Sequence, residues 1–267
     1  MKGNYVDNTQ NIISFCTGYG GIELGIKRTG LDVRTIAYVE IEAFAVANLV
    51  AKIEQGKMDA APIWTNLKTF DGEPFRGKVH GIIGGYPCQP FSIGGRYRLG
   101  TQDPRHLWPY IEKHIRAVDP IWCFFENVEG HLGKGFDEVL ESLRRMGFAV
   151  EAGLFGTKEL GFDFDRPRLF ILAYSESRGG RRRELASSSN QGQVPSVPKN
   201  KQALVWCETK GHIRNEPAEG FKSKPLLDRR VDGSPFRLDR IRLCGNGVVP
   251  EAAELAFRTL WSKLNQQ

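Results

Sequence analysis

Cys88 is the residue of this sequence best placed to act as a nucleophile. It follows an apolar run at 79–83, which predicts a buried strand, and two glycines, Gly84 and Gly85, that let the backbone turn closely. Open α/β sheets bind their ligands at the carboxyl ends of such strands. A buried, unreactive cysteine explains this position equally well by itself. The other motifs of the sequence favour the nucleophile.

A glycine-rich turn near the start of the sequence predicts a cradle for a nucleotide-like cofactor. It reads Thr-Gly-Tyr-Gly-Gly at 17–21, between a predicted strand at 11–16 and a predicted helix at 22–29. The glycines permit close approach, and the start of the helix offers free amide donors.

Two polar residues follow this turn at positions that suit a nucleoside. Glu40 ends the next predicted strand, 33–39, about 20 residues beyond the turn, where an acid accepts hydrogen bonds from ribose hydroxyls. The alternative for Glu40 is an exposed acid that starts the predicted helix at 42–53. Asn66 lies in a short element at 64–70 and could reach the edge of a bound adenine.

Charged residues occur beside two further predicted strands. Glu126 comes directly after the apolar strand predicted at 121–125, and therefore lies at the ligand edge of the sheet, although an N-cap or surface role is the alternative. Arg166 and Arg168 lead into the apolar run 169–174, and two arginines that enter a buried strand need an anionic partner or a site to face. The Gly- and Arg-rich loop at 88–104 could hold a phosphate backbone.

The composition is that of a soluble globular protein with one basic segment. The 267 residues are 40% apolar and 25% charged, which suffices for one substantial core and a smaller lobe. Residues 175–242 hold 15 Lys and Arg against 8 Asp and Glu, so this segment carries the whole positive excess behind the net charge of +6. This asymmetry predicts a polyanionic partner, most simply nucleic acid, or else a solvated, partly disordered insert.

The remaining composition bears on the cellular setting. No apolar run is long enough to span a membrane, and the first residues lack a signal-peptide pattern. Five cysteines without a C-x-x-C pair predict neither a zinc site nor a disulfide framework. We therefore expect a cytoplasmic protein in a reducing environment.

The alternation of strands and helices predicts an α/β fold with a mostly parallel, doubly wound sheet. Helices are expected at 107–118, 136–146 and 251–264, with a further strand at 147–155. We expect a catalytic and cofactor-binding domain at 1–174, a short basic target-recognition region at 175–242, and a C-terminal segment at 243–267 whose helix returns to the catalytic domain.

In the order of its motifs the chain resembles the DNA cytosine-5 methyltransferases of bacteria and phages. The resemblance covers nearly the whole chain apart from 175–242. It rests on the turn at 17–21, Gly-Tyr-Pro-Cys-Gln at 85–89, Glu-Asn-Val at 126–128, Arg-Pro-Arg at 166–168 and Gly-Asn-Gly-Val-Val-Pro at 245–250. It implies a Rossmann-like class I S-adenosylmethionine-dependent fold with a small target-recognition lobe.

The resemblance also implies the activity. Methyl transfer from S-adenosyl-L-methionine to carbon 5 of a flipped-out cytosine in duplex DNA would proceed through a covalent adduct on Cys88. Glu126 would act at the ring nitrogen, Arg168 would hold the base, and Arg166 would support it. No metal is implied. The cofactor-binding residues implied are Cys16, Gly18, Tyr19, Gly20, Gly21, Ile22, Glu40, Ile41, Asn66, Leu67, Gly85, Pro87, Leu107, Asn246 and Gly247.

The sequence departs from the family pattern around the expected cofactor. An acid is usual at position 14 and Phe at 16, an aromatic residue at 41 and an acid at 66; here they are Ser14, Cys16, Ile41 and Asn66. These changes concern cofactor affinity more than the type of reaction.

Three other functions compete with this interpretation. The chain could methylate RNA with the same chemistry, or it could be a catalytically idle DNA-binding or regulatory homologue. A dinucleotide-dependent oxidoreductase would explain the glycine turn but not the Cys88 motif. The partners expected are double-stranded DNA and, in a restriction-modification setting, a cognate restriction endonuclease; we expect a monomer without membrane association.

Overall fold

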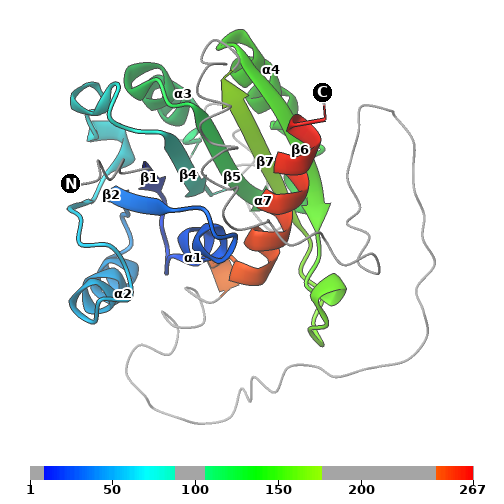
Figure 1. Ribbon diagram of the computed structural model, residues 1–267, viewed down its shortest axis with the longest axis horizontal. Coiled ribbons are helices and arrows are strands. Elements are labelled where there is room, and N and C mark those ends of the chain that lie inside the picture. Colours follow the sequence, from blue (N-terminus) through cyan, green and yellow to red (C-terminus); the bar gives the residue numbers. More distant parts are fainter. Residues whose placement is uncertain (1–8, 88–105, 176–244, 267) are drawn as a thin grey trace, which may run out of the picture.

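A seven-stranded sheet with the order β3-β2-β1-β4-β5-β7-β6 forms the centre of the protein in a computed structural model that describes residues 9–87, 106–175 and 245–266 (Figure 1). Strands β1 to β5 run parallel, whereas β7 runs antiparallel to both β5 and β6. The predicted α/β fold with a mostly parallel sheet is therefore confirmed. The strands are β1 (Gln10–Phe15), β2 (Val33–Val39), β3 (Ile63–Trp64), β4 (Gly81–Gly85), β5 (Trp122–Val128), β6 (Phe148–Phe155) and β7 (Arg168–Ser175).

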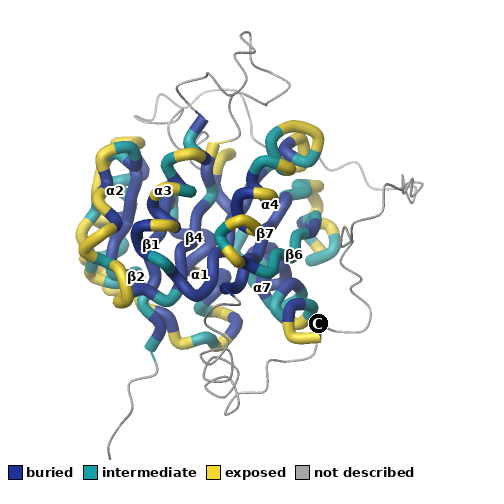
Figure 2. The backbone as a smooth tube through the Cα atoms, turned by 90° about the horizontal axis from the view of Figure 1, so that it is seen from above, coloured by how far each residue is buried: buried dark blue, intermediate teal, exposed yellow. Residues whose placement is uncertain are grey.

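Five α-helices cover the described part of the sheet: α1 (Gly21–Arg28), α2 (Ala43–Glu54), α3 (Trp108–Val118), α4 (Phe136–Arg145) and α7 (Pro250–Leu264). Short 3-10 helices occupy Leu67–Thr69, Glu73–Phe75, Glu129–His131 and Lys158–Leu160. Figure 2 shows that buried residues run through the central strands while exposed residues gather on the outer sides of helices and loops. None of the helices in the described ranges is long and apolar enough to cross a membrane.

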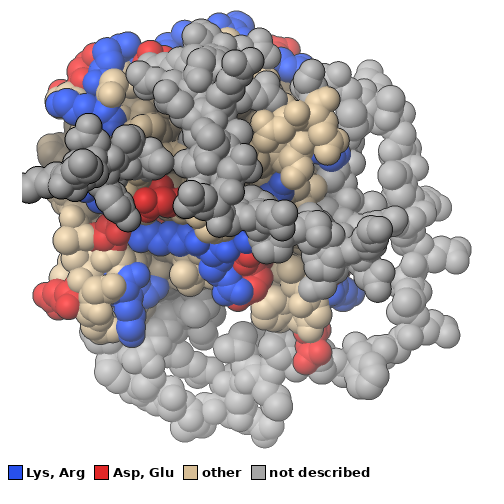
Figure 3. All heavy atoms as spheres, viewed as in Figure 1, with Lys and Arg blue, Asp and Glu red and all other residues tan. Residues whose placement is uncertain are grey.

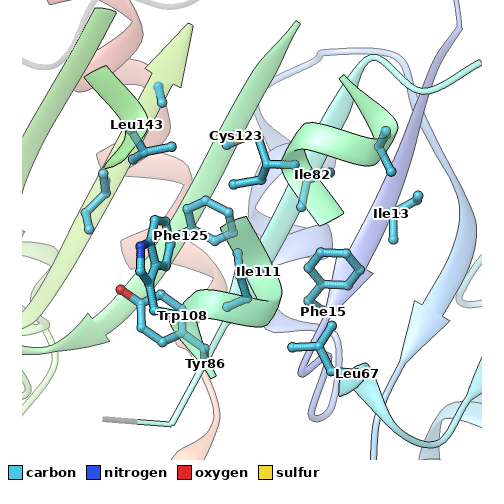
Figure 4. Packing of buried hydrophobic residues seen from close by; sticks show 14 of the residues in the cluster. Ile13, Phe15, Leu67, Ile82, Tyr86, Trp108, Ile111, Cys123, Phe125 and Leu143 are labelled. Atoms are coloured by element: carbon cyan, nitrogen blue, oxygen red, sulfur yellow. The ribbon is translucent and has the colours of Figure 1, made fainter. Parts of the chain in front are cut away.

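The central strands β1, β4, β5 and β7 are buried on both faces, as near-continuous apolar runs of a helix-covered sheet require. Successive side chains point to opposite faces, so Phe124 packs in one core cluster and Phe125 in the other. The cluster with Phe124 is closed by α1 and α7, and the cluster with Phe125 by α3 and α4, whose Trp108 and Leu143 appear in Figure 4.

Two strand ends differ from the sequence prediction in a way that matters for the site. β4 begins at Gly81 and continues through Gly85, and β5 continues to Val128, so Glu126 lies inside β5 and not directly after it. The prediction that Glu126 follows the strand is therefore wrong. The reason is pairing on both sides, because Glu126 lies opposite Gly85 of β4 and opposite Phe170 of β7.

The last helix closes the fold against the first. As predicted, it begins near residue 251, and it packs on α1, β6 and β7 (Figure 1). A β-carbon on Gly25 of α1 would lie 2.6 Å from that of Ala253, so only glycine allows this approach. Arg28 forms ion pairs with Glu251 at 2.7 Å and Glu254 at 3.0 Å.

Phe257→Ala is expected to lower the free energy of unfolding by about 3–5 kcal/mol, because large-to-small changes in a core leave a cavity. Phe257 is 4% exposed, with its ring centroid 5.2 Å from Phe124 and 5.6 Å from Trp122. Urea unfolding measures the change. Ser262→Ala, an exposed position of the same helix, is the control and should change stability by no more than about 0.5 kcal/mol. Equal stability of the two variants would contradict the packing of α7.

Candidate active site

The glycine turn between β1 and α1 adopts backbone conformations that favour glycine. Gly18 and Gly20 have φ values of 58° and 85°. A β-carbon on Gly21 would lie 2.0 Å from the carbonyl oxygen of Val248, so this glycine lets the C-terminal motif approach the turn. The turn is thus shaped by its own backbone and by the chain that returns at 245–250.

Glu40 is the residue that connects the turn to β2. Its carboxylate accepts hydrogen bonds from the amide of Gly18 at 2.7 Å and from the amide of Glu42 at 2.8 Å. The residue is 6% exposed. Since a carboxylate offers about four lone-pair sites, these two bonds leave capacity for ribose hydroxyls. Ile41 beside it is 69% exposed, so its side chain is available as a contact surface.

Cys16, the other cysteine near the predicted site, is not suited to act as the nucleophile. Burial, together with the charge of Glu40, raises the pKa of the Cys16 thiol to about 12. The thiolate is the nucleophilic form of cysteine. Cys16 therefore stays protonated near neutral pH and serves as a small packing residue beside the turn.

Tyr19 joins the glycine turn to the last motif. The hydroxyl of Tyr19 donates to the carbonyl oxygen of Val248. The ammonium group of Lys52 donates to the backbone carbonyl oxygen of Tyr19 at 2.5 Å. A β-carbon on Gly247 would lie 1.6 Å from the Tyr19 ring, so a side chain at 247 would displace the tyrosine. Arg166 donates to the carbonyl oxygens of Gly245 at 2.7 Å and of Gly247 at 2.5 Å.

These contacts give Arg166 a role that its sequence position did not suggest. Its guanidinium holds the backbone of the C-terminal motif, which in turn packs on the turn at 17–21. Arg166 is thereby a positioning residue in the described structure. Its expected support of the base stays a prediction.

Glu126 and Arg168 form a buried ion pair, with 2.9 Å between Arg168 Nε and Glu126 Oε1. Glu126 is 5% exposed. Burial raises its pKa to about 7, and this effect outweighs the attraction of the Arg168 and Arg166 charges, which lower the pKa. Both the protonated and the ionised form of this carboxyl group are therefore populated near neutral pH. Arg168 has the anionic partner that its place before a buried strand required.

Gly85 leaves space next to this carboxyl group. A β-carbon at this position would lie 3.2 Å from Glu126 Oε2, tighter than ordinary van der Waals contact. The carboxyl ends of β4 and β5 are thus brought together, as the sequence predicted. Pro87 is the last described residue of this segment, and it is exposed. Cys88 and the loop to 105 lie outside the described residues, as does the basic segment at 176–244, so the distance from Cys88 to Glu126 stays a prediction.

The chain that leads to Cys88 is held by Asn127 of the 126–128 motif and by His131 and Trp108, which the sequence analysis did not single out. The amide of Asn127 donates to the carbonyl oxygen of Tyr86 at 3.2 Å. The hydroxyl of Tyr86 shares a hydrogen bond of 3.0 Å with Nε2 of His131, a buried residue whose pKa burial lowers to about 4. The Tyr86 ring also packs on Trp108 at 5.6 Å (Figure 4). Only the proximity of Tyr86 to Cys88 could have indicated this from sequence.

Three of the residues predicted to bind the cofactor make contacts within the protein that support the fold. The side-chain oxygen of Asn66, which we expected to face an adenine, accepts from the Lys68 amide at 2.9 Å and caps a 3-10 helix. Leu67 is buried, and its carbonyl is hydrogen-bonded to Nε2 of His114 at 2.7 Å. Leu107 packs against the core. Contacts of these residues with a cofactor stay predictions.

The sheet order, the glycine turn and the acid at the end of β2 define a Rossmann-like α/β fold of the kind that binds nucleotide-like cofactors. A family model described as C-5 cytosine-specific DNA methylase matches residues 10–224, and the chain belongs to this family. The resemblance inferred from the motifs is therefore confirmed.

Individual relatives agree with this family. The Type II methyltransferase M.NgoMIV of Neisseria gonorrhoeae is 30% identical over 60% of this chain and 50% of its own length. The orphan methyltransferase M.SPRI of Bacillus phage SPR is 24% identical over 81% of this chain and 49% of its own length. A solved DNMT2 from Spodoptera frugiperda, at 25% identity and a TM-score of 0.51, covers 63% of this chain and 51% of that structure. The matched region thus spans about half the length of these relatives.

Tyr86→Phe is expected to lower the free energy of unfolding by about 1–3 kcal/mol, because it removes the hydrogen bond between a buried hydroxyl and a buried nitrogen of His131. The measurement is urea unfolding at neutral pH, where His131 is uncharged. Tyr110→Phe, on a half-buried residue of α3, is the matched control and should change stability by less than about 0.5 kcal/mol. If both variants lose the same stability, the Tyr86–His131 hydrogen bond contributes no more to the free energy of unfolding than the hydroxyl of Tyr110 does.

Proposed function

We propose that this protein transfers a methyl group from S-adenosyl-L-methionine to carbon 5 of cytosine in double-stranded DNA. Family membership supports the reaction class. The observation that carries the proposal is the buried Glu126–Arg168 pair beside Gly85, three residues before Cys88. An acid with a raised pKa next to the approach to a cysteine is the arrangement that cytosine activation needs.

The cysteine supplies the step that cytosine cannot perform alone. Carbon 5 of the ring is too weak a nucleophile to take a methyl group directly. Attack of the Cys88 thiolate on carbon 6 forms a covalent bond and gives the ring enamine character, which activates carbon 5. After methylation, carbon 5 loses its proton and the cysteine leaves, so the enzyme returns to its starting state.

Glu126 accommodates the electron density that this attack pushes toward the ring nitrogen. In its protonated form it donates a hydrogen bond to that nitrogen, and in its ionised form it accepts one from the exocyclic amino group. Its pKa of about 7 makes both forms accessible near neutral pH. Arg168, 2.9 Å from the carboxylate, fixes the orientation of Glu126 and offers further donors to the base.

The residues around the glycine turn fit the expected cofactor. Glu40 lies buried at the end of β2 with capacity for ribose hydroxyls, and the turn at 17–21 permits close approach. Exposed Ile41 provides an apolar contact in place of the aromatic residue expected there. When bound, S-adenosyl-L-methionine supplies the activated methyl group; the residues of the chain hold it and exclude water.

The DNA-facing part of the proposal rests on charge. A stacked cytosine must leave the duplex at a cost of a few kcal/mol before any of these residues can reach it. We propose that the Arg-containing loop at 92–104 and the basic region 175–242 offset this cost through contacts with DNA phosphates. The basic region carries 15 Lys and Arg against 8 Asp and Glu. We further propose that the protein acts as a monomer, and we propose a cognate endonuclease only by analogy with type II relatives.

The direct test is bisulfite sequencing of DNA from cells that express the protein, with Cys88→Ser as the matched variant. We expect 5-methylcytosine in a defined sequence context for the natural chain. The variant should lose at least about 10³-fold in methylation because the hydroxyl is a far weaker nucleophile, while a mobility-shift assay shows DNA binding intact. Methylation that persists in Cys88→Ser would remove Cys88 from the reaction. Incubation with tRNA in parallel separates the RNA alternative, and calorimetry with S-adenosyl-L-methionine separates the idle homologue.

The pH dependence of the rate tests Glu126. The thiolate of Cys88 increases with pH, whereas protonated Glu126 is complete below its pKa of about 7 and is lost as the pH rises through it. We therefore expect a bell-shaped profile of kcat. Glu126→Gln, which keeps the shape but cannot deliver a proton, should lower the maximum about 10²–10³-fold and abolish the alkaline limb. Glu129→Gln, at an exposed position three residues later, is the control. An alkaline limb that survives in Glu126→Gln would belong to another group.

A further inference from the structure

Three backbone carbonyls of the C-terminal motif accept hydrogen bonds from side chains that are far away in the sequence. Arg166 donates to the carbonyl oxygens of Gly245 at 2.7 Å and of Gly247 at 2.5 Å, and the hydroxyl of Tyr19 donates to that of Val248. Arg166 lies just before β7, and Tyr19 lies in the glycine turn. We call these two side chains, Tyr19 and Arg166, the clasp.

Arg166 fixes the backbone around Asn246. The two carbonyls that it holds belong to the residues directly before and after Asn246. Gly247 is buried, whereas Asn246 is exposed, so the asparagine side chain is available to a ligand. Asn246 and Gly247 are two of the residues that we expect to bind the cofactor. Arg166 therefore acts on this part of the predicted cofactor site without having to contact the cofactor itself.

Tyr19 completes the clasp from the glycine turn. A β-carbon on Gly247 would lie 1.6 Å from the tyrosine ring, so the two residues are in close contact. The ammonium group of Lys52 lies over the same ring, 5.1 Å from its centroid, and donates to the backbone carbonyl of Tyr19 at 2.5 Å. The tyrosine is thus held by α2 as well as by the C-terminal motif. A shift of the motif would break its contacts with the predicted cofactor cradle.

Arg166 also acts on the acid that is expected to face the base. Burial raises the pKa of Glu126 to about 7, and the charges of Arg168 and Arg166 lower it. On the described surface in Figure 3, basic side chains lie directly beside acidic ones, and Arg116 with Glu112 at 2.7 Å is an ion pair of this ordinary kind. Arg166 instead combines two backbone carbonyls with an effect on a buried acid.

We propose that the clasp positions residues 245–248 for the cofactor, and that Arg166 serves the base side of the site as well, through its charge beside Glu126. This inference rests on the proposed methyl transfer, and neither clasp residue has to touch the reacting atoms. A segment that is not held must become ordered when the cofactor binds, so the apparent affinity falls with the ordered fraction. One guanidinium therefore affects both cofactor affinity and the protonation of the acid.

The first experiment measures how firmly the segment is held when no ligand is present. Hydrogen exchange followed by mass spectrometry reports the protection of the amides at 245–250. Arg166→Met should speed their exchange about tenfold or more, because it removes two hydrogen bonds to the segment. Arg116→Met, which removes an arginine with an ordinary ion pair, is the matched control and should leave this exchange unchanged.

The second experiment is calorimetry with S-adenosyl-L-homocysteine, the product that methyl transfer would leave. We expect Arg166→Met to weaken binding about tenfold or more and Tyr19→Phe about threefold or more, because each removes bonds that order the segment. Arg166→Lys keeps the charge but loses the fork of donors that reaches two carbonyls, so it should bind nearly as weakly as Arg166→Met. Tyr110→Phe and Arg116→Met should bind like the natural chain.

The third experiment separates charge from geometry at Glu126. Carbon-13 NMR of labelled glutamate side chains gives its pKa, and the signal is identified by its absence in Glu126→Gln. Arg166→Met should raise this pKa above about 7, because a positive charge that favours the ionised form is lost. Arg166→Lys and Tyr19→Phe should leave it near 7. A loss of stability alone would not produce this difference between the variants.

Any of three results would overturn the proposal: Arg166→Met binds S-adenosyl-L-homocysteine like the natural chain, Arg166→Lys does so, or Tyr19→Phe shifts the pKa of Glu126 as much as Arg166→Met does. Circular dichroism and urea unfolding check that the variants are folded. If the natural chain itself binds no S-adenosyl-L-homocysteine, the proposed methyl transfer fails. The exchange at 245–250 and the pKa of Glu126 need no ligand, so they still decide whether the clasp exists.

Discussion

The burial of the Glu126 carboxyl group beside the Arg168 guanidinium is the constraint on which the site depends. Removing a carboxylate from water is costly, and in practice a buried acid shifts its pKa unless a partner compensates fully. Here the partner at 2.9 Å compensates in part, so the pKa settles near 7 instead of returning to its ordinary value. An acid in this state can both give and accept a proton near neutral pH.

The sheet makes this burial possible. β5 pairs in parallel with β4 on one side and antiparallel with β7 on the other, so the backbone on both sides of Glu126 is hydrogen-bonded. The antiparallel β7 places Arg168 opposite Val128, within reach of the carboxylate. Gly85 of β4 has no side chain, so the carboxyl group of Glu126 can lie against it on the opposite side. The reversal of one strand thus delivers the guanidinium to the edge where the parallel strands deliver the acid.

Much of this could be predicted from the sequence, because the motifs are local. The turn at 17–21, the strand at 33–39 and the last helix each carry their own pattern, and the structure has them within one or two residues of the predicted bounds. The end of β5 could not be predicted, because Asn127 and Val128 pair only with β7, more than 40 residues later, and Glu126 pairs with both Gly85 of β4 and Phe170 of β7. The same holds for the contacts of Arg166 with Gly245 and Gly247 and for the Tyr86–His131 bond, which exist only in the folded chain.

Glu23 and Glu126 show why a raised pKa alone does not identify a catalytic acid. Both are almost fully buried and both have a pKa near 7. Glu126 lies at the carboxyl edge of the sheet with an arginine on one oxygen and the approach to a cysteine beside the other. Glu23 lies in the first turn of α1, where its neighbours are Ser14, Lys27 and Lys52. The same desolvation therefore acts on both acids, and their neighbours decide which of them lies where a base could take up its proton.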